Sequence, residues 1–380
     1  MGLHPVYVTA TAAFLPNAPL SNERMETVLG QAGGRPSRAR RMVLRSNGIV
    51  NRHYAMDPVT RCFTHTNAQL AAEAVRQLPV AAGDVQCLAC GTSIADQLMP
   101  GHASMVQGEL AWPACEAVST SGVCVSGMTA WRYAMNAVRC GDAQRAVATG
   151  SELASASMRA ECFVEEQDAQ VTALAQQPEL AFEQDFLRWM LSDGAGAVLM
   201  EPQPRAGRCN LRVDWLDIVS YAGEMETCMY AGAIKQPDGH LQGWQTFSSR
   251  ERHPLTVFSV KQDVKLLNDQ VIAWTVEKPL QQIVASRQLL AEQVDYFLPH
   301  YSSAYFRERL QAGLQRVGLD IPFSKWFTNL ADCGNTGSAS LYIMLNQLVH
   351  SGQLVSGDRL LCYVPESGRF STAFMHLTVV

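Results

Sequence analysis

An internal duplication constrains the fold of this chain more than any other feature of its sequence. Two segments match in character, Gly83 to Ser93 (GDVQCLACGTS) and Gln293 to Ser303 (QVDYFLPHYSS). Each has a polar start, a short apolar run and then a loop of small or hydroxylic residues, which is the pattern of a strand that leads into a loop. Two copies of one structural unit are the simplest explanation.

The match continues downstream at nearly equal offsets. Cys124 lies 34 residues after Cys90, and Asn335 lies 35 residues after His300. Both residues lie in loops of small residues that lead into a predicted helix, WRYAMNAVRC in the first copy and LYIMLNQLVH in the second. A glycine follows each helix, and the chain then turns toward an apolar strand, RAVATG or RLLCYVP.

These alternating strands and helices predict an α/β protein with mainly parallel sheets covered by helices. We divide the chain into two related halves, residues 1–205 and residues 206–380. The Glu- and Gln-rich stretch 163–191 has helical character and is interpreted as an insertion over one face or as a solvated surface excursion. A chain of 380 residues with 47% hydrophobic side chains can form one large core or two domain-sized ones.

Charge and hydropathy argue against two classes of protein. A net charge of −5 without any Lys/Arg run gives no basic field that would attract nucleic acid. No apolar run reaches the roughly 18 residues of a membrane span, and the N-terminus has neither a charged n-region nor an apolar h-region. We therefore expect a cytoplasmic protein with no nucleic-acid or membrane partner.

The cysteines and glycines predict neither a metal nor a cofactor. Eleven cysteines, an odd number in a long chain, indicate a reducing compartment. Cys87 and Cys90 form a C-x-x-C pair within an apolar segment that is typical of a buried strand, so we expect no metal site. The stretch Ser192 to Ala197 (SDGAGA) predicts a tight turn into a strand and lacks the G-x-G-x-x-G pattern of a dinucleotide loop, so we expect no cofactor.

Cys124 is the candidate nucleophile, because a helix start with unpaired N–H groups stabilises a thiolate. The plainer alternative is a buried structural thiol, as free cysteines often are. His300 follows an apolar strand, and Asn335 lies in a glycine-rich segment where asparagine is an ordinary turn residue. Because the three occupy related loops of the two copies, we expect Cys124, His300 and Asn335 to converge on one pocket.

At these residues the chain resembles the thiolase superfamily, and specifically the β-ketoacyl-acyl-carrier-protein synthase III group. The resemblance spans nearly the whole chain and rests on five motifs in the family's order. They are RSNGIVNRHYA (Arg45 to Ala55), SGVCVSG around Cys124, DGAGAVLM (Asp193 to Met200), LPH (Leu298 to His300) and GNTGSAS (Gly334 to Ser340).

The resemblance implies a thiolase fold, in which two pseudo-symmetric halves form αβαβα layers, and a homodimer. It also implies a ping-pong acyltransferase reaction on CoA or acyl-carrier-protein thioesters. Cys124 would carry the first acyl group, while His300 and Asn335 would hydrogen-bond the carbonyl of the second thioester. The oxyanion hole would use the backbone N–H groups of Cys124 and Gly368, the latter in a turn that matches the family's glycine-rich loop imperfectly.

Departures from the family pattern point toward specialised metabolism. His300 is followed by Tyr-Ser-Ser instead of Gln-Ala-Asn. Where many members have a tryptophan that stacks on the CoA adenine, this chain has Arg38, Arg40 and Arg41, which suit an acidic carrier protein or phosphates, or form a solvated basic face. The segment SRARRMVLRSNGI, with THTNAQL and the central insertion, resembles the branch that makes dialkylresorcinols or cyclohexanediones from a β-ketoacyl thioester.

Three residues have two interpretations each. Glu152 could be the base of a non-decarboxylating condensation or a structural carboxylate that caps a neighbouring helix. Leu98 and Met99 resemble a family loop that reaches across the dimer, and they could line the pocket or belong to the core. The alternative functions are a fatty-acid initiation synthase that uses malonyl carrier protein, an ester- or amide-forming acyltransferase, and a non-catalytic heterodimer partner. The intact Cys, His and Asn set argues against the last.

Overall fold

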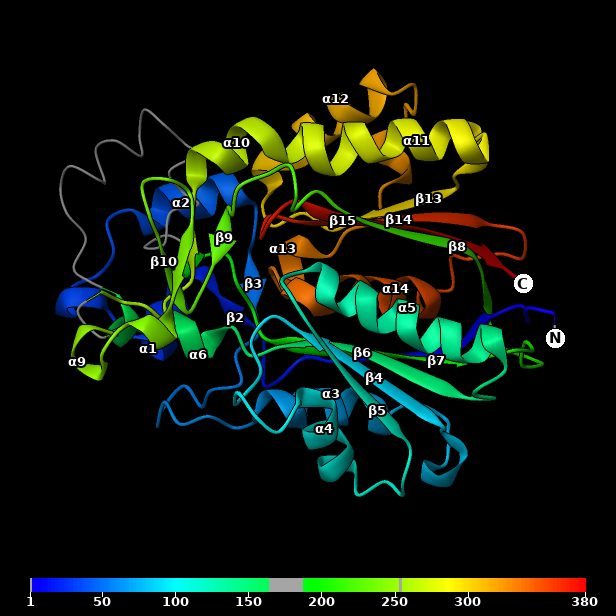
Figure 1. Ribbon diagram of the computed structural model, residues 1–380, viewed down its shortest axis with the longest axis horizontal. Coiled ribbons are helices and arrows are strands. Elements are labelled where there is room, and N and C mark those ends of the chain that lie inside the picture. The colour runs from blue at the N-terminus through cyan, green and yellow to red at the C-terminus, as the bar shows by residue number, and fades with distance from the viewer. Residues whose placement is uncertain (1, 164–186, 253–254) are drawn as a thin grey trace.

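The fold is organised around one large mixed sheet (Figure 1). The computed structural model describes residues 2–163, 187–252 and 255–380. Within them a nine-stranded sheet has the order β13-β14-β15-β8-β1-β7-β6-β4-β5. The strands are β1 (Tyr7–Phe14), β4 (Cys87–Thr92), β5 (Glu116–Ser121), β6 (Ala146–Glu152), β7 (Gly194–Glu201), β8 (Leu211–Ser220), β13 (Tyr296–Pro299), β14 (Arg359–Glu366) and β15 (Ser371–Val379).

The strand directions correct one prediction, because the sheet is not mainly parallel. Strand β4 runs parallel to β5 and β6, and β13 runs parallel to β14. The pairs β6–β7, β7–β1, β1–β8, β8–β15 and β15–β14 are antiparallel. The physical reason is clearest at β14 and β15, which are joined by a short turn, and a hairpin connection can only produce antiparallel neighbours.

The strand order is nearly the same from either end of the sheet. The series β5-β4-β6-β7-β1 in the first part of the chain corresponds to β13-β14-β15-β8 in the second. A parallel bridge pairs Trp326 with Phe297 of β13. Trp326 therefore takes the place beside β13 that β5 takes beside β4 in the first series. The two series join through only two residue pairs of β1 and β8. The proposed boundary after residue 205 falls in the β7–β8 connection and stays a prediction.

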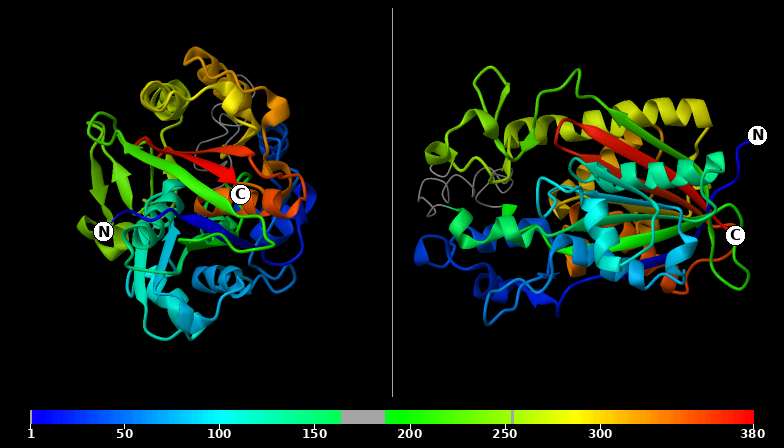
Figure 2. Two further views of the ribbon diagram at one scale, coloured as in Figure 1. Left: turned by 90° about the vertical axis from the view of Figure 1, so that its right-hand side faces the viewer. Right: turned by 60° about the horizontal axis from the view of Figure 1, so that its bottom comes forward.

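Helices form three layers around the two series of strands, as Figures 1 and 2 show. Helices α5 (Val125–Cys140) and α14 (Ser340–His350) lie between the series, and they confirm the two helices predicted from the repeat. The outer layers consist of α3 (Asn67–Arg76) and α4 (His102–Leu110) on one side, and α10 (Val264–Ile272), α11 (Lys278–Arg287) and α12 (Arg307–Arg316) on the other. The predicted αβαβα layering is therefore confirmed.

Glycine allows the central layer to pack closely enough to bring the two loops together. A Cβ atom on Gly127 of α5 or on Gly150 of β6 would lie 2.3 Å from the carbonyl oxygen of Ser338. The hydroxyl of Tyr342 in α14 donates to the Gly127 carbonyl at 2.7 Å. The start of α5, which carries Cys124, therefore lies directly against the turn that precedes α14.

Short elements complete the described chain. They are β2 (Leu20–Ser21), α1 (Met25–Leu29), α2 (Arg40–Asn47), β3 (Asn51–Arg52), α6 (Ser155–Met158), β9 (Met229–Tyr230), β10 (Ala233–Lys235), β11 (Leu241–Gly243), α9 (Ser249–Arg252), β12 (Lys261–Gln262) and α13 (Leu330–Cys333). The predicted insertion 163–191 lies mostly outside the described residues. No helix among the described residues is both long and apolar enough to cross a membrane.

Candidate active site

The structure brings Cys124, His300 and Asn335 to one cavity of about 140 Å³. Each is held at the end of a regular element. Cys124 caps the N-terminus of α5, and His300 directly follows β13. Asn335 lies between α13 and the 3-10 turn that leads into α14. The three residues come from both series of strands, so the cavity lies where the two parts of the fold meet.

Cys124 has surroundings that keep its thiol protonated. Burial raises the pKa of this thiol, and the nearby carboxylates of Glu366 and Glu152 raise it further. Burial and the two carboxylates thus oppose the stabilisation of a thiolate that is expected at a helix start. The backbone N–H of Cys124 has no acceptor on any other described residue and lies near its own thiol sulfur, so it can bind an incoming carbonyl oxygen when the thiol is acylated.

His300 is a neutral hydrogen-bonding group at pH 7. Its side chain is buried, and burial lowers its pKa to about 4. The backbone N–H of His300 donates to the Tyr363 carbonyl at 2.8 Å, which fixes the residue against β14. Neither ring nitrogen has a partner among the described residues, so the neutral ring can offer one N–H donor to a ligand in the cavity.

Asn335 presents its amide nitrogen to the cavity. Its Oδ1 accepts a hydrogen bond from the Gly337 N–H at 3.0 Å, which assigns that end of the amide as oxygen. The backbone is held on both sides, because the Asn335 N–H donates to the Met190 carbonyl and its own carbonyl accepts from the Ser192 N–H. The Nδ2 group, without a partner in the described chain, remains as a second donor in the cavity that His300 also lines.

Glu152 lines the same cavity, and its two carboxylate oxygens differ in their hydrogen bonding. Its Oε1 accepts from the Ser93 hydroxyl at 2.6 Å, from the Ser93 N–H at 3.1 Å and from the Ser338 N–H at 3.0 Å. These bonds hold the turn before α14 against the end of β4, which is a structural role of the kind considered from sequence. Its Oε2 has no hydrogen-bond partner among the described residues, and burial raises the pKa of this carboxyl.

The predicted second donor of the oxyanion hole lies at the edge of the site. Gly368 does not line the cavity, whereas its neighbour Ser367 does. A Cβ atom on Gly368 would lie 3.2 Å from a methyl carbon of Val123, so the turn lies against the loop of the nucleophile. The N–H groups of Ser367 and Gly368 both lack an acceptor in the described structure.

Leu98 and Met99 neither line the cavity of this chain nor belong to its core. Their side chains are 78% and 81% exposed.

The Arg-rich segment leads into α2, where Arg40 forms an ion pair with Glu26 at 2.7 Å while Arg41 is exposed. The Arg40 side chain is thus already paired with a carboxylate of the same chain.

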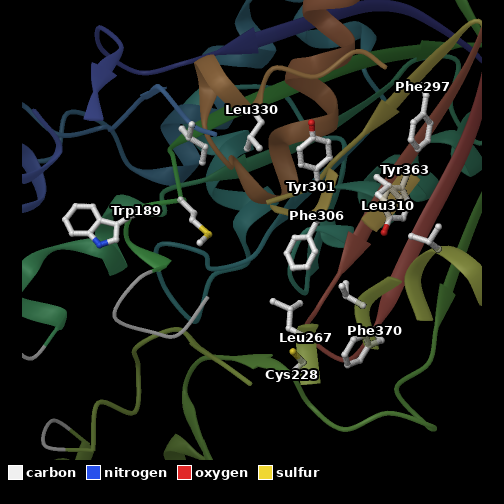
Figure 3. Close-up of a cluster of buried hydrophobic side chains, with 14 of the residues drawn as sticks. Trp189, Cys228, Leu267, Phe297, Tyr301, Phe306, Leu310, Leu330, Tyr363 and Phe370 are labelled. Atoms are coloured by element: carbon white, nitrogen blue, oxygen red, sulfur yellow. The ribbon is translucent and has the colours of Figure 1, made fainter. Parts of the chain in front are cut away.

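Sequence reasoning missed the apolar wall of the cavity. This wall comes mainly from α10, α12 and the segment between β13 and α12, and it consists of Leu267, Val271, Ile272, Tyr301, Phe306 and Leu310. Figure 3 shows Phe306 between Tyr301 and Leu267, with Tyr363 and Leu310 beside them. The only available signal was the amphipathic pattern of the helices, which does not distinguish a cavity wall from a core.

Sequence reasoning also missed Glu366, whose carboxylate contacts the nucleophile loop. Its Oε2 accepts from the N–H groups of Val123 at 2.9 Å and Val125 at 3.1 Å. The one signal was the imperfect match of this turn to a glycine-rich loop.

A layered α/β fold with a cysteine at a helix start, and with histidine and asparagine donors in the same cavity, defines the class of thioester-condensing enzymes. Comparison with known proteins agrees. Residues 38–206 match the N-terminal domain of β-ketoacyl synthases, and residues 284–372 match the C-terminal part of 3-oxoacyl-[acyl-carrier-protein] synthase III.

Whole-chain relatives give the same result. The β-ketoacyl-[acyl-carrier-protein] synthases III of Ruegeria sp. (strain TM1040) and of Cereibacter sphaeroides (strain ATCC 17023) are each 25% identical, over 93% of this chain and 93% of their own. The chain is therefore similar to the synthase III ketosynthases over nearly its whole length, and it is an acyltransferase of the condensing type.

Solved structures share the fold. AbyA1, a tetronic acid condensing enzyme, has a TM-score of 0.75 at 21% identity and covers 98% of this chain and 99% of its own. The synthase III FabH from Pseudomonas aeruginosa PAO1 has a TM-score of 0.70 at 18% identity, over 99% of both chains. OleA from Xanthomonas campestris with lauric acid and lauroyl-CoA has a TM-score of 0.69 at 19% identity, again over 99% of both chains.

Proposed function

We propose that this enzyme joins an acyl group held on Cys124 to a second thioester by a Claisen-type condensation. The observation that carries the proposal is the cavity in which Cys124, His300 and Asn335 meet. A thiol and two neutral donors are what such a reaction needs, because negative charge develops first on the acyl carbonyl oxygen and later on an enolate oxygen.

In the first half-reaction, Sγ of Cys124 bonds to the acyl carbon of a CoA or carrier-protein thioester. The bond from that carbon to the carrier sulfur breaks, and the thiol proton ends on the departing sulfur. The N–H of Cys124 binds the carbonyl oxygen during this step, together with the N–H of Gly368 in the proposed oxyanion hole.

In the second half-reaction, the α-carbon of another thioester becomes the nucleophile. It loses a proton to a base or loses its carboxylate as CO₂, and the resulting enolate oxygen accepts hydrogen bonds from His300 and Asn335. The α-carbon then bonds to the acyl carbon, the bond to Sγ breaks, and Cys124 regains a proton. Glu152 is the proposed base when a proton must be removed, since its Oε2 is unpartnered and its pKa is raised.

The proposed acceptor is a β-ketoacyl thioester, and the product is a precursor of a cyclohexanedione or dialkylresorcinol. The apolar wall of Leu267, Phe306 and Leu310 suits alkyl chains better than a small polar acyl group. Among the structural neighbours, AbyA1 is a tetronic acid condensing enzyme, and OleA was solved with bound lauric acid and lauroyl-CoA, which supports a role in specialised metabolism.

A second candidate is fatty-acid initiation with malonyl carrier protein, which is the activity in the names of the 25%-identical relatives. The two candidates share the first half-reaction and differ in the acceptor.

We further propose a homodimer that accepts CoA or carrier-protein thioesters. A cytoplasmic location fits the cysteines, all eleven of which are unpaired.

The test is intact-protein mass spectrometry after exposure to a panel of acyl-CoA and acyl-carrier-protein thioesters. We expect a single acyl adduct that is lost in Cys124→Ala and retained in the control Cys62→Ala, since Cys62 is exposed. The acylated enzyme is then given β-ketoacyl or malonyl thioesters, and the products are compared. An adduct that persists in Cys124→Ala contradicts the proposal, and turnover with malonyl thioester alone favours the second candidate.

A further inference from the structure

The nucleophile loop is held by a carboxylate that comes from the far end of the chain. Glu366, the last residue of β14, accepts hydrogen bonds through Oε2 from the N–H groups of Val123 and Val125. These two donors flank the N–H of Cys124, which has no acceptor on any other described residue. One side chain therefore occupies the donors on either side of the nucleophile and leaves the middle one available.

The surroundings of this carboxylate are shaped to admit it. A Cβ atom on Gly122 would lie 3.3 Å from Glu366 Oε2, and one on Gly368 would lie 3.2 Å from Oε1. The lack of side chains at both positions leaves room for the carboxylate. Glu366 does not line the cavity itself, whereas Pro365 and Ser367 on either side of it do, as expected from alternation along an extended strand.

The charge of Glu366 opposes the usual effect of a helix start on a cysteine. The N–H groups at a helix start stabilise a thiolate, but here the N–H of Val125, the first residue of α5, and the N–H of Val123 in the preceding loop donate to a carboxylate instead. The charged or titratable groups around Cys124 are Glu366 from β14, Glu152 from β6 and His300 beside β13, and none of them supplies a positive charge at neutral pH. The two carboxylates therefore favour the thiol over the thiolate.

We propose that Glu366 is a positioning residue that holds the Cys124 N–H ready for the acyl carbonyl and keeps the Cys124 thiol protonated in the resting enzyme. This rests on the proposed function of Cys124 as the acyl carrier. Attack then occurs mainly when a thioester is bound, and other electrophiles meet a weakly nucleophilic thiol. The two parts of the role can be separated, since the hydrogen bonds need an oxygen acceptor and the effect on the thiol needs a negative charge.

The test compares Glu366→Gln, Glu366→Asp and Glu366→Ala with the control Glu308→Gln, whose exposed carboxylate lies on α12. The rate of Cys124 alkylation by iodoacetamide is measured from pH 6 to pH 10 by mass spectrometry, and acylation by acyl-CoA is followed separately. Glutamine keeps an acceptor and removes the charge, so we expect alkylation at pH 7 to be roughly three- to tenfold faster with a profile shifted to lower pH. Acylation should stay near wild type.

Glu366→Ala removes both functions, so its alkylation profile should shift in the same direction while acylation falls on the order of tenfold. Partial recovery of acylation in Glu366→Asp would support the hydrogen-bonding part. The proposal is overturned if the alkylation profile of Glu366→Gln matches that of wild type and the control. It is also overturned if alanine and glutamine acylate equally well. If wild type accepts no thioester, the proposed function fails, and alkylation alone still decides whether Glu366 controls the thiol.

Discussion

At the scale of single residues, the cavity contains neutral hydrogen-bond donors where charged ones would be the simpler way to stabilise an enolate. His300 is too deeply buried to be protonated at pH 7, and Asn335 is neutral at every pH. Such donors bind a developing oxyanion without binding strongly to carboxylates or phosphates in the resting state. In the proposed second half-reaction, these donors would bind the enolate oxygen more strongly than the thioester carbonyl from which it forms.

Substitution His300→Ala should therefore separate the two half-reactions. We expect condensation to fall about 10²- to 10³-fold, as for other lost oxyanion donors, while acylation of Cys124 is largely retained. Because the pKa of His300 is about 4, wild-type condensation should show no loss from His300 protonation between pH 5.5 and 8. Single-turnover assays on pre-acylated enzyme measure this, with His240→Ala as control, since the His240 side chain is 85% exposed. An equal loss in both half-reactions would argue for a general structural effect.

The substitution Glu152→Gln tests both the proposed base and the identity of the second thioester. Glutamine preserves the Oε1 bonds to Ser93 and Ser338 and replaces the unpartnered Oε2 by an amide that cannot take a proton. Condensation with a β-ketoacyl thioester should fall about 10²-fold, whereas decarboxylative condensation with a malonyl thioester should change little. The comparison is made by product quantification with both acceptors. Equal losses with both would assign Glu152 a purely structural role.

At the scale of elements, the internal repeat correctly predicted the helices, whose positions depend on local sequence pattern. The helices that follow Cys124 and Asn335 are confirmed, because glycine-terminated apolar segments define them locally. The mostly antiparallel pairing was not predicted, because it depends on how strands such as β14 and β15 are connected. The convergence of Cys124, His300 and Asn335 followed from the symmetry of the repeat, whereas the contact of Glu366 with Val123 depends on side-chain packing between distant segments.

Packing between the central helices gives a prediction about stability. A Cβ atom on Gly127 would lie 2.3 Å from the Ser338 carbonyl oxygen, and this backbone cannot move without displacing the turn beside Asn335. Gly127→Ala should destabilise the fold by about 3 kcal/mol. Gly108 in α4 is the matched control, because it is an exposed helical glycine with open space around it. Gly108→Ala should stabilise the fold by about 0.5–1 kcal/mol. Chemical denaturation of both variants measures the difference, and similar free energies of unfolding would contradict it.

At the scale of the whole molecule, one edge of the sheet is open among the described residues. Strand β5 has only β4 as a neighbour there, and all of its residues are exposed or partly buried. The chain meets this edge a few residues after Leu98 and Met99, where the Ala103 N–H at the start of α4 donates to the Ser119 hydroxyl of β5 at 2.8 Å. A strand whose outer edge is unpaired, near exposed apolar side chains, favours pairing with another chain. We expect this surface to form the interface of the proposed homodimer.

Met99→Glu should therefore weaken the dimer, because a carboxylate would be buried against apolar surface. We expect wild type to sediment as a dimer at micromolar concentration, and the variant to dissociate with a dissociation constant raised on the order of 100-fold, since one buried unpaired charge costs several kcal/mol. Val355→Glu is the control, because Val355 is also an exposed apolar residue, in the connection before β14. Analytical ultracentrifugation over a range of concentrations distinguishes the three proteins. A monomeric wild type, or equal dissociation of both variants, would place the interface elsewhere or remove it.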